Sequence, residues 1–274
     1  MSFDRDKYII DNLKEKAEIV ENKGYNLFAL FLQGSQNYEL DIYSDEYKSD
    51  VDAKAIIIPS FDDIVLNRKP ISTTLVLENN EHIELKDIRI MKDMWVKQNI
   101  SYIELLYTKY IIYDDDKWGT MLYTLLNMRD KISNIDKNQF LKCIKGMSME
   151  KLKALEHPYP TIKDKIDKYG YDPKQLHHIM RLAEFVNRYL EEDIDLVNCY
   201  VSMEKKLLLD VKLGKYDLDF AREYSVRFDN FTKEICDKYI SDDNKIDNDA
   251  ICELNNWVSD VLRFSLKKEL LEEE

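Results

Sequence analysis

Two short apolar runs constrain the fold of this chain more than any other feature. The first covers residues 27–32 and is followed by Gly34, and the second covers residues 51–58 and is stopped by Pro59. Short, continuous apolar runs bounded by turn-forming residues are typical of buried central strands. A polar loop, residues 36–49, joins the two. The pattern therefore predicts a small sheet in which a glycine turn ends one strand before the next begins.

Charged residues open the second run and should share one face of the strand. Because side chains alternate across a strand, Asp50, Asp52 and Lys54 are expected to project together. Carboxylates are preferred Mg²⁺ ligands, and a lysine ammonium can meet a phosphate; capping of a sheet edge is the alternative interpretation of Lys54. Gly34 lets the backbone approach phosphates, and the hydroxyl and amide of Ser35 can donate to them. Together these residues predict a site for a metal-bound nucleotide.

A third carboxylate would complete a site for two metal ions. Residues 72–77 and 82–90 resemble a hairpin, and Glu84 lies opposite its apolar neighbours in the second strand. We expect Glu84 to be the third ligand, with Asp87 as the substitute. The alternative interpretation of Glu84 is the polar face of a hairpin.

The order of elements predicts an α+β fold. A helix over residues 5–22 precedes the strands, and the second half of the chain reads as helical. The predicted helices of that half cover about 117–130, 136–156, 173–191, 200–211, 217–240 and 249–271. We therefore expect a small mixed sheet flanked by helices in a domain over 1–125, followed by an all-helical domain over 126–274.

Composition limits the partners and the compartment. The net charge of −13 repels nucleic acid at long range, although a lysine-rich segment, 136–175, keeps an RNA end open as a partner. Four scattered cysteines without C-x-x-C spacing fit free thiols in a reducing compartment. The N-terminus lacks an apolar signal core and the apolar runs are too short to span a membrane, so we expect a cytoplasmic protein without a membrane partner.

The signature of Gly34-Ser35 followed by Asp50-Val51-Asp52 resembles the nucleotidyltransferase superfamily of polymerase-β-like fold. More narrowly, the chain looks like the predicted nucleotidyltransferases of bacteria and their phages, a group related to the RNA-ligase-associated nucleotidyltransferases. Further stretches that fit this group lie at 34–38, 49–54, 103–107, 169–182 and 208–216. The resemblance therefore covers most of the chain.

The resemblance implies an enzyme that moves a nucleoside monophosphate from an NTP, such as ATP, to an acceptor. Mg²⁺, or Mn²⁺ in its place, would be held by Asp50 and Asp52, with Ser35 at the phosphates. The acceptor stays open between an RNA end, a protein side chain and a small molecule. The rival hypotheses are a catalytically inactive nucleotide-binding or host-interaction protein on the same fold, and an antitoxin-like enzyme that modifies a partner protein.

One residue of the helical half has a predicted role at the nucleotide. His178 and Arg181 lie one turn apart on a predicted helix, so Arg181 is a candidate for contacting a phosphate or the acceptor. The alternative is a buried pair that holds this helix against a neighbour.

Overall fold

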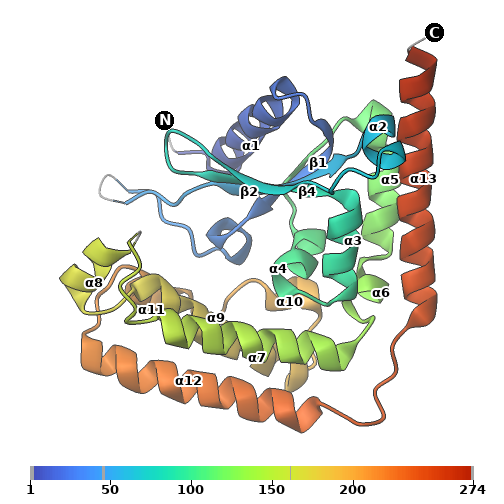
Figure 1. Ribbon diagram of the computed structural model, residues 1–274. Coiled ribbons are helices and arrows are strands. Elements are labelled where there is room, and N and C mark those ends of the chain that lie inside the picture. The colour runs from blue at the N-terminus through green and yellow to red at the C-terminus, as the bar shows by residue number, and fades with distance from the viewer. Residues whose placement is uncertain (1–2, 45–46, 161, 273–274) are drawn as a thin grey trace. The chain divides into compact units, whose positions relative to one another are not determined.

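The computed structural model describes residues 3–44, 47–160 and 162–272 (Figure 1). The chain divides into two compact units. The first takes in the chain up to Asn37, Asp41–Asp136 and the part from Ile246 onward, and the second comprises Tyr38–Leu40 and Lys137–Lys245. The division thus falls at 136/137 where the sequence pattern placed it at 125/126, and the last helix belongs to the first unit.

A five-stranded mixed sheet forms the centre of the first unit, in the order β3-β4-β2-β1-β5. The strands are β1 (Asn26–Gln33), β2 (Asp52–Ile58), β3 (Ser72–Val76), β4 (His82–Asp87) and β5 (Ile111–Ile112). The β2 and β4 strands are parallel, and every other neighbouring pair is antiparallel. The expected α+β class with a mixed sheet and a helical region is confirmed.

Helices cover both faces of this sheet. They are α1 (Arg5–Asn22), α2 (Phe61–Val65), α3 (Ile88–Val96), α4 (Ile100–Ile103), α5 (Asp115–Asn127), α6 (Arg129–Ser133) and α13 (Asn248–Glu272), with 3₁₀ turns η1 (Ser35–Tyr38) and η2 (Glu104–Tyr107). The α1 helix packs on one face (Figure 1), where Ile9, Leu13 and Val20 are fully buried. Their spacings of four and seven residues, about one and two helical turns, place them on one stripe of the helix, which is why α1 covers the sheet.

An aromatic cluster fills the opposite face. The Phe28 ring of β1 meets Trp118 of α5 at 5.3 Å and Trp257 of α13 at 5.6 Å between ring centroids. The indole of Trp118 donates to the Leu27 carbonyl and that of Trp257 to the Met121 carbonyl, so the buried N–H groups are satisfied. The α13 helix packs against α3, α5 and α6.

The second unit is helical. It contains α7 (Lys137–Ala154), α8 (Lys163–Tyr169), α9 (Pro173–Leu190), α10 (Leu196–Cys199), α11 (Lys205–Lys212) and α12 (Leu218–Tyr239). The α9 helix is the central one, because it packs against α7, α11 and α12 and buries residues on most of its circumference. In the part of the chain that the structure describes, no helix is both long and apolar enough to pass through a bilayer.

Local capping explains one boundary that the pattern misplaced. The second strand of the hairpin was expected to run to Ile90, but α3 begins at Ile88. The Asp87 carboxylate accepts the Arg89 N–H at 2.9 Å and caps the helix. The short elements α2, β5 and α8 were not predicted, because two to seven residues carry too little periodicity to distinguish an element from a loop.

Candidate functional site

The glycine turn at the end of β1 requires its glycine. Gly34 has φ +108°, a backbone conformation that a side chain disfavours, whereas a Cβ there would meet only ordinary contacts. The chain enters η1 at Ser35 directly after it. Gly34 and Ser35 are both half-exposed, so the turn is partly open to solvent.

Two amide side chains lock this turn in place. The Asn37 amide donates to the Leu32 carbonyl at 2.9 Å, and its oxygen accepts the Thr108 hydroxyl at 2.6 Å. The buried Gln36 amide donates to the Asp50 carbonyl at 2.7 Å. The residues after Gly-Ser therefore fasten the turn both to its own strand and to the segment that carries the predicted metal ligands.

Strand register brings the two halves of the signature together. Gln33 of β1 is the antiparallel partner of Asp52 of β2. Gly34 therefore follows the residue that faces Asp52, at the same edge of the sheet. The Asp50 side chain is exposed and the Asp52 side chain is half-exposed, so solvent reaches both carboxylates.

A buried ion pair holds the segment between the aspartates. Val51 donates its backbone N–H to Glu81 Oε1 at 2.9 Å. The other carboxylate oxygen of Glu81 is bound by the Lys16 ammonium of α1, and both side chains are almost fully buried. Burial alone would raise the pKa of Glu81, but the bonds from Lys16 and Val51 outweigh it and lower that pKa. No local pattern indicates this contact, because Glu81 lies in the expected hairpin turn.

His82 is a second neighbour of Asp52 that sequence reasoning missed. The parallel register of β2 and β4 places Ala53 beside Ile83, and hence Asp52 beside His82. The His82 backbone N–H donates to Asp52 Oδ1 at 2.9 Å, and its Nδ1 lies 3.4 Å from the same oxygen. The imidazole is half-exposed at this edge of the sheet. It stands where a third acidic side chain would lie closest to Asp52.

Glu84 lies two residues after His82 on β4, on the same face of the sheet, and is bound by other side chains. Register pairs it with Lys54, so it shares the face of Asp52. Its carboxylate accepts the Tyr102 hydroxyl at 2.8 Å and contacts the ammonium groups of Lys86 at 2.9 Å and Lys54 at 3.2 Å. Burial alone would raise the pKa of Glu84, but these three donors together lower it.

Lys54 lies inside the first unit. Its side chain is 2% exposed, donates to the Ser101 carbonyl at 3.0 Å, and sits 3.7 Å from the centroid of the Tyr102 ring. Desolvation lowers the pKa of Lys54, and attraction to Glu84 and Glu104 opposes that effect. The ammonium therefore ties α4 to the sheet. The phosphate contact expected of Lys54 stays a prediction.

The two predicted carboxylates, Asp50 and Asp52, are of the ligand type that Mg²⁺ prefers. Asp50 and Asp52 offer solvent-accessible oxygens, and Mg²⁺ is commonly held by one or two carboxylates with phosphates and waters completing its shell. Among the residues that the structure describes, no three or more His, Cys, Asp or Glu side chains are grouped so as to hold a metal ion by themselves. A metal at this edge would thus complete its shell with oxygens from waters or from a bound phosphate.

Asp87, the substitute for Glu84, is placed elsewhere. It pairs with Ile57, five residues along β2 from Asp52, roughly 16 Å away at the usual rise of a strand. Asp87 is three residues from Glu84 on β4, an odd number, so its side chain points to the other face of the sheet. Its carboxylate binds the Arg89 guanidinium at 2.6 and 2.9 Å. Asp87 is therefore not the third ligand.

Arg181 belongs to the second unit, on α9. The guanidinium lies 3.7 Å from the centroid of the Tyr38 ring, which is in the same unit, and the residue is 6% exposed. Its Nε is buried without a hydrogen-bond partner among the described residues. Burial, reinforced by nearby cations, keeps the pKa of both His177 and His178 well below the ordinary value, so both imidazoles are neutral. The phosphate contact expected of Arg181 stays a prediction.

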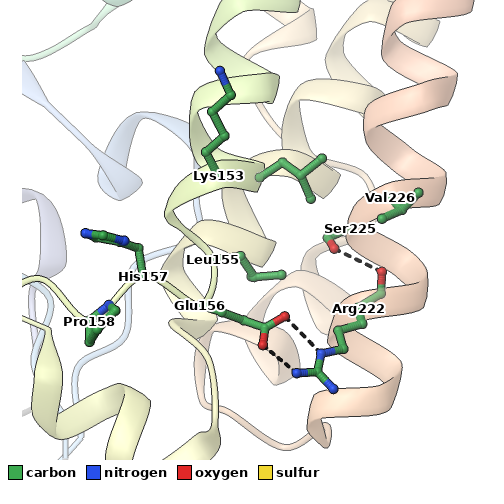
Figure 2. A pocket seen from close by; sticks show the side chains of 9 residues that line it. Lys153, Leu155, Glu156, His157, Pro158, Arg222, Ser225 and Val226 are labelled. Atoms are coloured by element: carbon green, nitrogen blue, oxygen red, sulfur yellow. Dashed lines mark hydrogen bonds and ion pairs between the residues drawn. The ribbon is translucent and has the colours of Figure 1, made fainter.

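A cavity of about 340 Å³ lies within the second unit, between the end of α7 and α12 (Figure 2). The Glu156 carboxylate and the Arg222 guanidinium meet there at 2.6 and 2.9 Å, and this bond lowers the pKa of Glu156. His157 points away from this pair (Figure 2). The Ser225 hydroxyl, which also lines the cavity, donates to the Arg222 carbonyl at 3.1 Å. Because the charged pair and this hydroxyl are bound to each other's segments, we assign this cavity no catalytic role.

Comparisons with known proteins do not by themselves assign a function to this chain. No protein-family model and no curated protein matches the chain. Among solved structures, the chain is similar to the crystal structure of a nucleotidyltransferase-like protein from Exiguobacterium sibiricum 255-15. The match covers 93% of this chain and 90% of that one, with 11% identity and a TM-score of 0.30. Backbones superpose poorly at such a TM-score, so function must be argued from the geometry of this chain.

Proposed function

We propose that this chain is a nucleotidyltransferase that moves a nucleoside monophosphate from an NTP to an acceptor hydroxyl. The observation that carries the proposal is the hydrogen bond from the Gln36 amide to the Asp50 carbonyl, together with the pairing of Gln33 and Asp52. These contacts join a glycine turn, suited to phosphates, to an Asp-x-Asp segment, suited to a metal.

Each part of this edge has a proposed task. Asp50 and Asp52 would hold Mg²⁺, or Mn²⁺ in its place, and the ion would neutralise charge on the phosphate oxygens. The backbone at Gly34 and the hydroxyl of Ser35 would donate to the triphosphate. Glu84 is the proposed third ligand; because it is bound by Tyr102, Lys86 and Lys54, a metal would have to replace at least one of these donors.

The reaction balances without a further reagent. The acceptor oxygen forms a bond to the α-phosphorus, the bond from that phosphorus to the bridging oxygen breaks, and pyrophosphate leaves. The proton of the acceptor passes to solvent, which reaches the exposed Asp50 side chain. Asp52 keeps its orientation during this step through the backbone N–H of His82.

The acceptor is proposed by class. An RNA end, a protein side chain and a small molecule each offer a nucleophilic hydroxyl. RNA binding would depend steeply on salt because counterions are released from the phosphates, so an affinity that does not change with salt would exclude RNA.

The test is transfer of label from each α-³²P-NTP, with Mg²⁺ or Mn²⁺, into RNA and protein of a cell extract. We expect label with the wild-type chain and with Asp11→Asn, an exposed aspartate of α1 that serves as the matched control. The Asp50→Asn/Asp52→Asn variant should lose more than a hundredfold in rate, because the metal ligands are gone. Equal labelling by this variant and the wild type would overturn the proposal.

A non-catalytic nucleotide-binding protein is the second candidate. It is favoured by the mutual engagement of Glu84 and Lys54 and by the lack, within the described residues, of a ready three-ligand metal group. It predicts that NTP binds in equilibrium dialysis while no nucleotide yields product. Binding without transfer, in a folded protein, would favour this candidate.

A further inference from the structure

The first unit contains a pocket of its own, at the opposite end of the strands from Asp50 and Asp52. Its volume is about 670 Å³, within the range typical of small-molecule sites. It is formed where β2 ends at Ile57–Ser60, beside the end of β4, and it is bordered by α5 and α13. Asp52 and Ile58 are six positions apart along β2, roughly 20 Å at the rise of a strand, so this pocket is distinct from the proposed metal edge.

The lining of this pocket is cationic although the chain is strongly acidic. Three acidic side chains, Asp63, Asp87 and Glu269, face five basic ones. The basic residues are Arg68, Lys69, Arg89, Lys117 and Lys268. The excess of two positive charges, five minus three, stands on a molecule whose net charge is −13. Charge of one sign gathered in a concave surface attracts the opposite charge.

Two of the acidic side chains fix the arginines in place. Asp87 is almost fully buried and binds Arg89 through Nε at 2.9 Å and Nη2 at 2.6 Å, which raises the pKa of Arg89. Asp63 accepts the Ser60 N–H at 3.1 Å and Arg68 Nη1 at 3.2 Å. The arginines are therefore pre-positioned, which lowers the entropic cost of binding an anion.

The third acidic side chain already acts as an anion inside the pocket. The Glu269 carboxylate of α13 accepts the Phe61 N–H with both oxygens, at 3.2 and 3.0 Å. It joins segments more than two hundred positions apart in the chain, as the separation of 208 shows. A negatively charged group is thus accommodated here by a main-chain donor and its cationic surroundings.

The lysines extend the positive surface around this carboxylate. Lys117 donates to Asn26 Oδ1 at 2.9 Å and lies 4.9 Å from the Trp118 ring centroid, so its ammonium is held at the pocket wall. Lys69 is exposed at the rim, in the segment between α2 and β3. Lysine ammonium groups act as point charges that suit phosphate without demanding a fixed geometry.

We propose that this pocket binds a small ligand through its phosphate groups, with Lys69, Lys117 and Arg68 as the main contacts. A phosphate monoester carries about −1.5 to −2 charges at pH 7, which matches the excess of two positive charges better than a single carboxylate does. Glu269 lowers the affinity of the pocket for phosphate, because its carboxylate repels the incoming phosphate. The site does not depend on the proposed transferase activity and is tested by binding alone.

The experiment is isothermal titration calorimetry with pyrophosphate and with ADP, without divalent metal, on the Asp50→Asn/Asp52→Asn background. That background removes the predicted metal ligands, so binding there reports this pocket. Lys69→Gln and Lys117→Gln should each weaken binding about fivefold, the factor expected for a charge about 4 Å away in water. Glu269→Gln should strengthen it by a similar factor. Lys14→Gln, an exposed lysine of α1, is the matched control and should leave affinity unchanged.

Opposite effects of the lysine and Glu269 variants cannot arise from partial unfolding, and circular dichroism on each variant checks the fold. Equal affinity for pyrophosphate and ADP would assign recognition to the phosphates alone, and tighter ADP would add the nucleoside to it; both support the site. The proposal is overturned if neither probe binds at millimolar concentration. It is also overturned if Lys117→Gln and Lys14→Gln bind alike.

Discussion

Replacing Glu81 by Gln should destabilise the first unit and disturb the segment between the two aspartates. The substitution keeps an oxygen for the Val51 N–H but leaves the Lys16 ammonium buried without its counter-charge. Removing one partner of a buried ion pair costs about 3–5 kcal/mol. That is a large fraction of the roughly 5–15 kcal/mol that stabilises a typical domain. It corresponds to a fall in melting temperature of roughly 10 °C.

A thermodynamic cycle isolates this pair. The Lys16→Met/Glu81→Gln variant removes both charges and should recover most of the loss, because no unpaired ion remains. Lys14→Gln, on the exposed side of the same helix, should stay within about 0.5 kcal/mol of the wild type. Melting followed by circular dichroism at pH 7 is measured for the wild type, Glu81→Gln, Lys16→Met and the double variant, which close the cycle, and for the Lys14→Gln control. A loss below about 1 kcal/mol for Glu81→Gln would contradict this prediction, since it would mean that Lys16 is solvated or re-paired at little cost.

Three further predictions concern the same edge of the sheet. Gly34→Ala should cost about 1–3 kcal/mol because the backbone has φ +108°, and thermal melting measures it; no loss would mean that the turn relaxes. Lys54→Met should cost about 1–3 kcal/mol in urea denaturation, less than a fully buried pair, because Glu84 keeps Lys86 and Tyr102; a stabilised variant would contradict this. The lowered pKa values of Glu81 and Glu84 contribute stability that is complete above pH 4.5 and is lost as the pH falls through the folded-state values, so the melting temperature should drop below pH 4.5. This drop should be shallower in Glu81→Gln, and an identical pH profile would exclude Glu81 as a source.

The helical periodicity of the sequence predicted where helices form better than it predicted which elements they pack against. The stripe of α1 identified its buried face, and the amphipathic stretch near the C-terminus identified α13 as a helix. The packing of α13 against α3, α5 and α6 was not foreseen, because an apolar stripe specifies that a face is covered and leaves open what covers it. The division of the chain into units consequently differs from one drawn along the sequence.

In the candidate site, too, some features follow from the local sequence and others from the packing of the whole unit. Local backbone geometry was enough to predict the glycine turn and the strand that follows the first aspartate. The strand begins at Asp52, so Asp50 precedes it and does not share in its alternation. Three contacts depend on how the strands pack: Glu81 binds Val51, His82 lies beside Asp52, and Glu84 binds Lys54. These contacts join residues thirty positions apart and depend on the parallel pairing of β2 with β4. Local periodicity specifies which face a residue occupies, whereas the choice of neighbouring strand and its register is made by packing of the whole unit.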